Sequence, residues 1–267
     1  MKSDIVLPAQ KTIYSQRVAQ VIDRIIPVIP ASVNVAQFCA TTIIACNEMQ
    51  DGSVHPDSVL IAVLNAARVG LTPGSALGLA YFVPRKGKCN LEVGYRGYLD
   101  LAFGNKHLKN VHAEVVLEGE PFNWKVTETG PKVEHELSLS RDVTTGSCRK
   151  NCVGAYCVYE TAAGGVGVRV VTRKQLNGVD SNRHVWNSDY YEMARKTAIR
   201  RAAKDWKITA ELGYALHLDQ QSDLGKEQQP LVEGLELSLP LDDEVVSLAS
   251  IPDDGPTEYD DLLKNND

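Results

Sequence analysis

A dense group of cations occupies one short stretch of this chain. The segment Tyr191–Lys207 carries six lysines and arginines against two acids, although the whole chain has a net charge of -6. At about 100° per residue, four of these cations share one narrow arc of a helix, and largely apolar residues fall opposite. The cations on the arc are Lys196, Arg200, Lys204 and Lys207, and the residues opposite are Tyr191, Ala198, Ala202 and Trp206. Such a row favours a phosphate backbone as its partner, with an ordinary solvated helix face as the alternative.

A second group of cations is expected at the tip of a β-hairpin. Strand-like sequences at Leu79–Pro84 and Cys89–Val93 flank the short connection that holds Arg85, Lys86 and Lys88. No acid stands beside these three cations in the sequence, so they have no obvious local partner. They indicate a second contact to an anionic molecule.

The elements that must position these cations read as helices first and strands later. Residues 120–147 have few periodic apolar positions and are expected to form an irregular, mobile excursion. Helices are expected at 35–49, 56–69 and 95–103, and further strands at 111–117, 152–160 and 165–172. This order predicts an α+β fold, with a helical N-terminal region and a small antiparallel sheet on which the long basic helix packs.

Charge divides the chain into two parts. Residues 219–267 hold 14 acids and 2 bases, a charge of -12, which leaves +6 for residues 1–218. We therefore expect a folded body at 1–218 and an acidic tail at 219–267, disordered from about Gln220, with 231–241 as a short apolar segment. A basic body with an acidic tail is typical of proteins that handle single-stranded nucleic acid, where the tail competes for the basic groove or recruits a partner. The alternative is a tail that only keeps the protein soluble.

Several chemistries are missing from the sequence. There is no Walker A loop, no Gly-x-Ser-x-Gly and no Gly-x-Gly-x-x-Gly that opens a helix, so no ATP-driven activity and no cofactor are expected. The six cysteines form no Cys-x-x-Cys pair, which predicts reduced thiols and no structural metal. No secretion leader or membrane-spanning run is evident, so a cytoplasmic location is expected.

Two other functions stay open at this stage. The carboxylates of the body are scattered, and Glu92 and Asp100 are the two that could serve a metal-dependent nuclease, although neither lies in a nuclease pattern. In the third hypothesis, a structural or partner-docking protein, the basic helix would meet an acidic protein surface.

Two ordered motifs resemble those of the RecT single-strand annealing proteins of phages and prophages. The first is VGLTPGSALGLAYFVP at Val69–Pro84, followed by VGYRGYLDLA at Val93–Ala102. The second is Trp186 followed by EMARKTAIRR at Glu192–Arg201. The resemblance extends from about residue 10 to about residue 210 and departs at Asp205–Thr209, where relatives often have an aromatic residue followed by Leu-Pro.

The resemblance implies a protein that is not an enzyme. It implies binding of single-stranded DNA, assembly into rings or helical filaments, and annealing of complementary strands without ATP in the bacterial host cell. It also implies an exonuclease as a working partner, and the tail suggests host single-strand binding protein as another. On this reading, residues 1–218 form the annealing and oligomerisation domain. The residues expected to contact DNA are Arg85, Lys86, Lys88, Tyr95, Arg96, Lys196, Arg200, Arg201 and Lys204.

Overall fold

Capping residues mark where the N-terminal helices begin and end. The computed structural model describes residues 5–74, 76–104, 106–128, 130–179, 184–207 and 209–230. Asn34 accepts a hydrogen bond from the backbone of Gln37 at the start of α2, and Gly70 ends α3 in the left-handed conformation, with φ of 77°. The helical elements in this part are α1 (Ile13–Ile25), the short 3₁₀ helix η1 (Ile26–Val28), α2 (Val35–Asn47) and α3 (Pro56–Val69).

An antiparallel hairpin follows these helices. Strands β1 (Ala80–Arg85) and β2 (Lys88–Val93) pair with Phe82 opposite Leu91. Helix α4 (Tyr95–Gly104) begins directly after β2. The buried face of β2 packs on α3, so the hairpin belongs to the same core as the N-terminal helices.

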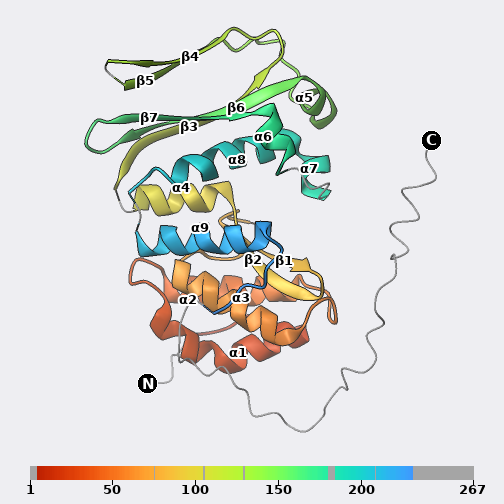
Figure 1. The fold of residues 1–267 in the computed structure, drawn as a ribbon. Helices are drawn as coiled ribbons and strands as arrows, with labels where there is room; N and C mark the ends of the chain where they lie inside the picture. Colours follow the sequence, from red (N-terminus) through yellow and green to blue (C-terminus); the bar gives the residue numbers. More distant parts are fainter. Residues whose placement is uncertain are drawn as a thin grey trace, which may run out of the picture. The chain divides into compact units, whose positions relative to one another are not determined.

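The second half of the body is built on an antiparallel sheet of order β3-β6-β7, formed by β3 (Leu108–Leu117), β6 (Cys152–Thr161) and β7 (Val166–Thr172). Helix α8 (Tyr190–Ala203) packs on one face of this sheet, and a hairpin of β4 (Phe122–Thr127) and β5 (Gly130–His135) lies beside the other face (Figure 1). The short helix α5 (Thr145–Asn151) lies between β5 and β6, whereas α6 (Arg173–Asn177) and α7 (His184–Ser188) connect β7 to α8. Helix α9 (Ala210–Asp223) returns to pack on α3, α4 and β2.

The expected α+β fold is confirmed, including the hairpins and the packing of the basic helix on the sheet. The expectation for residues 120–147 is wrong, because they contain β4, β5 and the start of α5. Glu120, His135 and Arg141 in this segment are held by ion pairs, which an apolar pattern does not reveal.

The expected start of a disordered tail at about Gln220 is also wrong. The boundary drawn between residues 218 and 219 falls inside α9, and the side chain of Gln228 is buried. The ordered body therefore extends to residue 230, whereas the rest of the acidic tail, 231–267, lies outside the described residues.

All six cysteines are buried and free, so none is bonded to another. Burial raises the pKa of the Cys46, Cys89 and Cys157 thiols to about 12, which leaves almost no reactive thiolate near neutral pH. These residues fill the core, as the apolar surroundings of Cys39 and Cys46 in the sequence indicate.

Candidate nucleic-acid interface

Helix α8 has a packed face, as its pattern predicts. Ala194, Ala198 and Ala202 are fully buried, and their small side chains let the helix approach the sheet closely. Trp206 packs edge-on against Tyr159 of β6, with ring centroids 6.0 Å apart.

The opposite arc of α8 does not present one open row of cations. Lys196 and Arg200 line a small pocket between α8, β2 and α9, together with Glu92 and Asp219. Arg200 Nη1 lies 3.7 Å from Asp219 Oδ2, and the Arg200 side chain is only 16% exposed. The Arg200 guanidinium therefore faces Asp219 and not open solvent, because α9, which the sequence pattern did not reveal, covers this part of the arc.

The C-terminal end of α8 is more open. Lys204 is exposed directly after the last residue of the helix, where the negative end of the helix dipole attracts a cation. Burial, and less strongly the nearby charges of Arg200 and Arg169, lower the pKa of Arg201. Asp205 already pairs with Arg169 on this surface.

Two of the three cations at the β1–β2 tip have acidic partners. Arg85 pairs with Glu92 across the hairpin, and Lys88 pairs with Glu227 from the segment after α9. The expectation that these cations lack acidic neighbours is wrong for Arg85 and Lys88, since Glu92 is seven residues from Arg85 on the paired strand and Glu227 is distant in the sequence. Lys86 is exposed at the tip with φ of 48°, and no ion pair to it occurs within the described ranges.

An exposed aromatic and cationic cluster lies at the start of α4. We call Tyr81, Tyr95 and Arg96 the Arg96 cluster. Arg96 Nε donates a hydrogen bond to the Tyr95 hydroxyl at 3.3 Å, and this bond raises the pKa of Arg96. A Cβ atom on Gly78 would lie 3.1 Å from the Tyr81 hydroxyl and 3.5 Å from Arg96 Cδ, so both side chains lie against Gly78 and beside each other.

Two glycines hold this cluster in place. A Cβ atom on Gly94 would lie 2.1 Å from the carbonyl oxygen of Gly78, and one on Gly97 would lie 2.2 Å from that of Leu79. The start of α4 therefore packs directly on the backbone that enters β1. The glycines of the VGYRG motif set the position from which Tyr95 and Arg96 project.

The candidate DNA contacts form separate patches. The charge of Glu192 acts on Arg96, which places the Arg96 cluster near the first turn of α8. Lys204 lies about 18 Å further along that helix, at about 1.5 Å per residue. A DNA strand that contacted both the Arg96 cluster and Lys204 would span several nucleotides between them. The geometry therefore suits an extended polymer better than a small ligand.

The free edge of β2 is closed by side chains that sequence reasoning missed. Ser58 Oγ accepts from Cys89 N at 2.8 Å, Gln228 Oε1 from Leu91 N at 2.8 Å, and Asp219 Oδ1 from Val93 N at 3.2 Å. Asp219 Oδ2 also accepts from the Tyr98 hydroxyl at 2.8 Å. Asp219 and Gln228 lie in the stretch that was expected to be tail. Their hydrogen bonds thus hold α9 and the following segment against the hairpin.

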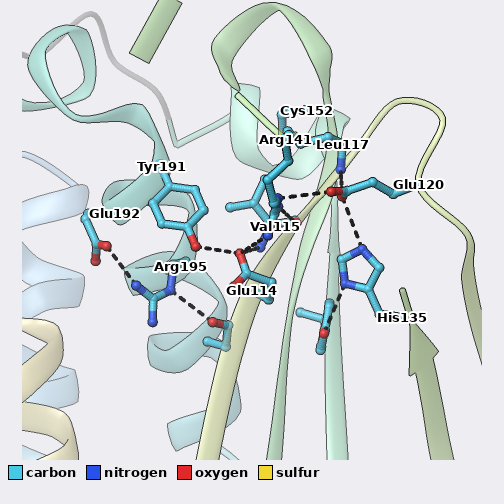
Figure 2. A network of polar contacts seen from close by, with 12 residues as sticks. Glu114, Val115, Leu117, Glu120, His135, Arg141, Cys152, Tyr191, Glu192 and Arg195 are labelled. Atoms are coloured by element: carbon cyan, nitrogen blue, oxygen red, sulfur yellow. Dashed lines mark hydrogen bonds and ion pairs between the residues drawn. The ribbon is translucent and has the colours of Figure 1, made fainter. Parts of the chain in front are cut away.

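A buried polar network links β3, α8 and the segment before α5 (Figure 2). Arg141 is at its centre, with Nη1 3.2 Å from Glu114 Oε1, Nε 3.0 Å from Glu120 Oε1, and a donated bond of 2.8 Å to the Val115 carbonyl. His135 lies 3.1 Å from Glu120 on the side away from α8. Nothing in the spacing of these residues pointed to their meeting.

At two of its positions, the basic helix α8 contributes to this network and does not face solvent. The Tyr191 hydroxyl donates to Glu114 Oε1 at 2.7 Å, and Arg195 Nε donates to the Ala113 carbonyl at 2.9 Å. Burial alone would raise the pKa of Glu114. The Tyr191 hydroxyl, the Val115 amide and the charges of Arg141 and Arg195 outweigh it and lower the pKa below the ordinary 4.5.

This shift predicts a pH-dependent loss of stability. Because the pKa of Glu114 is lower in the folded than in the unfolded chain, its ionised form stabilises the fold above about pH 4.5 and the stabilisation disappears as the pH falls further. Unfolding by urea should show Glu114→Gln to be less stable than the parent at about pH 7, with the difference shrinking at about pH 3. The same difference at both pH values would contradict the assignment.

A nuclease centre finds no support in the geometry. Glu92 is paired with Arg85, and Asp100 does not line the pocket that holds Glu92. No group of three or more His, Cys, Asp or Glu side chains is placed to hold a metal ion in the part of the chain that the structure describes. Over the same residues, no helix is long and apolar enough to cross a membrane.

Comparison with known proteins gives one consistent result. A model of the RecT family matches residues 36–231. The chain is 32% identical over 186 residues to "Protein RecT" of Escherichia coli (strain K12), a match covering 65% of this chain and 66% of that protein. It is 26% identical over 175 residues to "Uncharacterized protein YqaK" of Bacillus subtilis (strain 168), covering 64% and 59%. The matched region thus spans less than two thirds of each relative.

Proposed function

Because the chain belongs to the RecT family, we propose that it binds single-stranded DNA and anneals complementary strands without ATP. The observation that carries the proposal is the Arg96 cluster, which offers a guanidinium and two phenol rings on a surface fixed by close backbone packing. A cation holds a phosphate and a ring stacks on a base whatever the sequence. Annealing requires this tolerance.

The other candidate cations would contribute unequally. Lys86 and Lys204 are exposed and meet a phosphate directly, and Arg201 gains a counter-charge. Arg85, Lys88 and Arg200 are held by carboxylates, so a phosphate must displace Glu92, Glu227 or Asp219 to reach them. Lys196 contacts DNA only from the mouth of its pocket.

The annealing step itself needs no bond to be made or broken. The protein would hold one strand extended and neutralise its phosphates, while base pairing drives duplex formation. We infer a non-enzymatic role in the bacterial cytoplasm, with self-association into rings or filaments and with an exonuclease and single-strand binding protein as partners.

The direct test is to mix complementary oligonucleotides with the protein, with EDTA and without any nucleotide. We expect duplex to form faster than in buffer and both strands to keep their length. Annealing no faster than in buffer would refute the proposal. In a parallel reaction with Mg²⁺ in place of EDTA, shortening of the strands would instead identify a nuclease.

Arg96→Ala should weaken single-strand binding for every sequence alike. One lost phosphate contact should also reduce the slope of log K against log[salt] by about 0.7. Lys11→Ala is the matched control, since it removes an exposed cation from the N-terminal side of α1 and should leave the slope unchanged. An unchanged affinity for Arg96→Ala, measured by fluorescence anisotropy, would remove the cluster from the interface.

Ending the chain at Pro230 should strengthen DNA binding at low salt. Residues 231–267 carry 11 acids and 1 base, so their removal changes the net charge from -6 to +4. A tethered polyanion competes with DNA at high local concentration, and salt screens that competition. We expect the two affinities to converge as salt rises. Equal affinities at every salt concentration would show that the tail does not compete.

A further inference from the structure

Two arginines stack on one buried tyrosine at the N-terminal end of α8. The Tyr190 side chain is fully buried, and the guanidinium carbons of Arg149 and Arg173 lie 5.5 and 5.6 Å from the centre of its ring. Trp186 packs edge-on against the same ring, with centroids 5.4 Å apart. The ring is therefore a rigid support for two cations, one from α5 and one from α6.

Hydrogen bonds to the backbone fix both guanidiniums further. Arg173 Nη1 donates to the Cys152 carbonyl at 2.9 Å, and Arg149 Nη1 donates to the Trp186 carbonyl at 3.3 Å. Stacking uses the flat face of Arg173, and its Nε and Nη2 make no hydrogen bond within the part of the chain that the structure describes. A half-buried arginine held in this way presents two N–H groups side by side to an anion.

Two exposed lysines extend this pair of arginines. Lys150 follows Arg149 in the last turn of α5, and Lys174 follows Arg173 at the start of α6. We call these four cations the Tyr190 corner. No ion pair to Lys150, Arg173 or Lys174 occurs among the residues that the structure describes. These three cations therefore meet an anion without displacing a carboxylate.

The Tyr190 corner lies at the same end of α8 as the Arg96 cluster. Tyr190 is the first residue of the helix, and Glu192, whose charge acts on Arg96, is in the same turn. The Thr145 hydroxyl donates to the Ser188 carbonyl at 2.8 Å, which holds α5 beside the start of α8 (Figure 1). A polyanion bound at the Arg96 cluster can continue onto this corner, and the repeated phosphates of a nucleic acid match cations that occur at both places.

We propose that the Tyr190 corner is a second phosphate-binding surface, at which Arg173, Lys174 and Lys150 hold the backbone of a DNA strand beyond the Arg96 cluster. The inference rests on the proposed function and adds to it a contact surface that the sequence did not suggest. Arg173 binds a phosphate through Nε and Nη2 while its flat face stays on Tyr190. Contacts to the backbone alone carry no sequence information, so the corner binds all sequences alike.

Replacing Arg173 and Lys174 together by alanine tests the proposal. Two lost phosphate contacts should reduce the slope of log K against log[salt] by about 1.4, at about 0.7 per contact on single strands. Fluorescence anisotropy with labelled oligonucleotides of several sequences measures the affinity over a range of salt concentrations. The matched control is Lys11→Ala/Lys226→Ala, which removes two exposed cations from other parts of the chain and should keep the parent slope.

A second variant separates lost contacts from lost structure. Arg173→Ala removes a hydrogen bond that holds α6 to the end of α5, whereas Lys150→Ala/Lys174→Ala changes only exposed side chains. The lysine variant should unfold in urea like the parent and should still reduce the salt slope and weaken single-strand binding. A parent slope in a folded lysine variant would overturn the proposal.

The outcomes distinguish this inference from the proposed function. A parent chain that binds no single strand would refute both. A parent chain that binds DNA, with both variants keeping its slope, would overturn this inference alone. If both variants bind naked strands normally but fail to anneal strands coated with single-strand binding protein, the corner meets an acidic protein surface, and the proposal is again overturned.

Discussion

Replacing Asp219 by alanine is expected to lower the free energy of unfolding by about 3–5 kcal/mol, the cost of breaking a buried charged pair. Its carboxylate accepts from Val93 N and the Tyr98 hydroxyl and lies beside Arg200. The substitution leaves an edge amide and a buried phenol without an acceptor, and it removes the counter-charge of Arg200. Denaturant unfolding followed by circular dichroism would measure the loss.

Two variants on the same helix calibrate this result. Asp219→Asn keeps an acceptor oxygen but no charge, so its loss should be smaller. Gln220→Ala changes an exposed neighbour and should leave stability unchanged. A loss of under about 1 kcal/mol for Asp219→Ala would contradict the assigned role. A chain ending at residue 218 should be at least as damaged as Asp219→Ala, since it lacks both Asp219 and Gln228.

Replacing Arg141 by alanine should be comparably destabilising, again by about 3–5 kcal/mol. The substitution leaves the buried carboxylates of Glu114 and Glu120 without the guanidinium that lies between them. Arg141→Met, which retains the aliphatic bulk, should recover little, because the missing quantity is charge. Lys150→Ala in α5 is the exposed control and should behave like the parent.

The pH dependence separates lost charge from lost packing. Removing Arg141 raises the pKa of Glu114, and protonating Glu114 removes an unpaired buried charge, so the penalty of Arg141→Ala should shrink as the pH falls and Glu114 takes up a proton. A penalty that stays constant with pH would mean that the side chain acts through packing alone.

Local chemistry in the sequence predicted much of the fold. The caps at Asn34 and Gly70 and the hairpin around Lys86 and Gly87 depend on neighbouring residues, and they bound the helices and the hairpin that the sequence predicted. The apolar arc of α8 is likewise buried against the sheet. These features depend on backbone preference and on periodicity, which a single sequence contains.

Only the tertiary structure decided which cations are open to a partner. Arg85, Lys88 and Arg200 look alike in sequence to Lys86, Arg96 and Lys204, yet acids from other elements hold the first three. Glu227 and Asp219 lie far along the chain in a stretch whose composition resembles a tail. Charge pairing acts through space at a few ångströms, and it leaves no periodic trace in the sequence.

The polar interior was hidden for the same reason. Residues 120–147 look irregular because Glu120, His135 and Arg141 are buried by pairing with one another and with Glu114, without an apolar face. Hydrophobic periodicity reports burial that is driven by water exclusion. Burial that depends on matched charges becomes visible only when the fold brings the partners together.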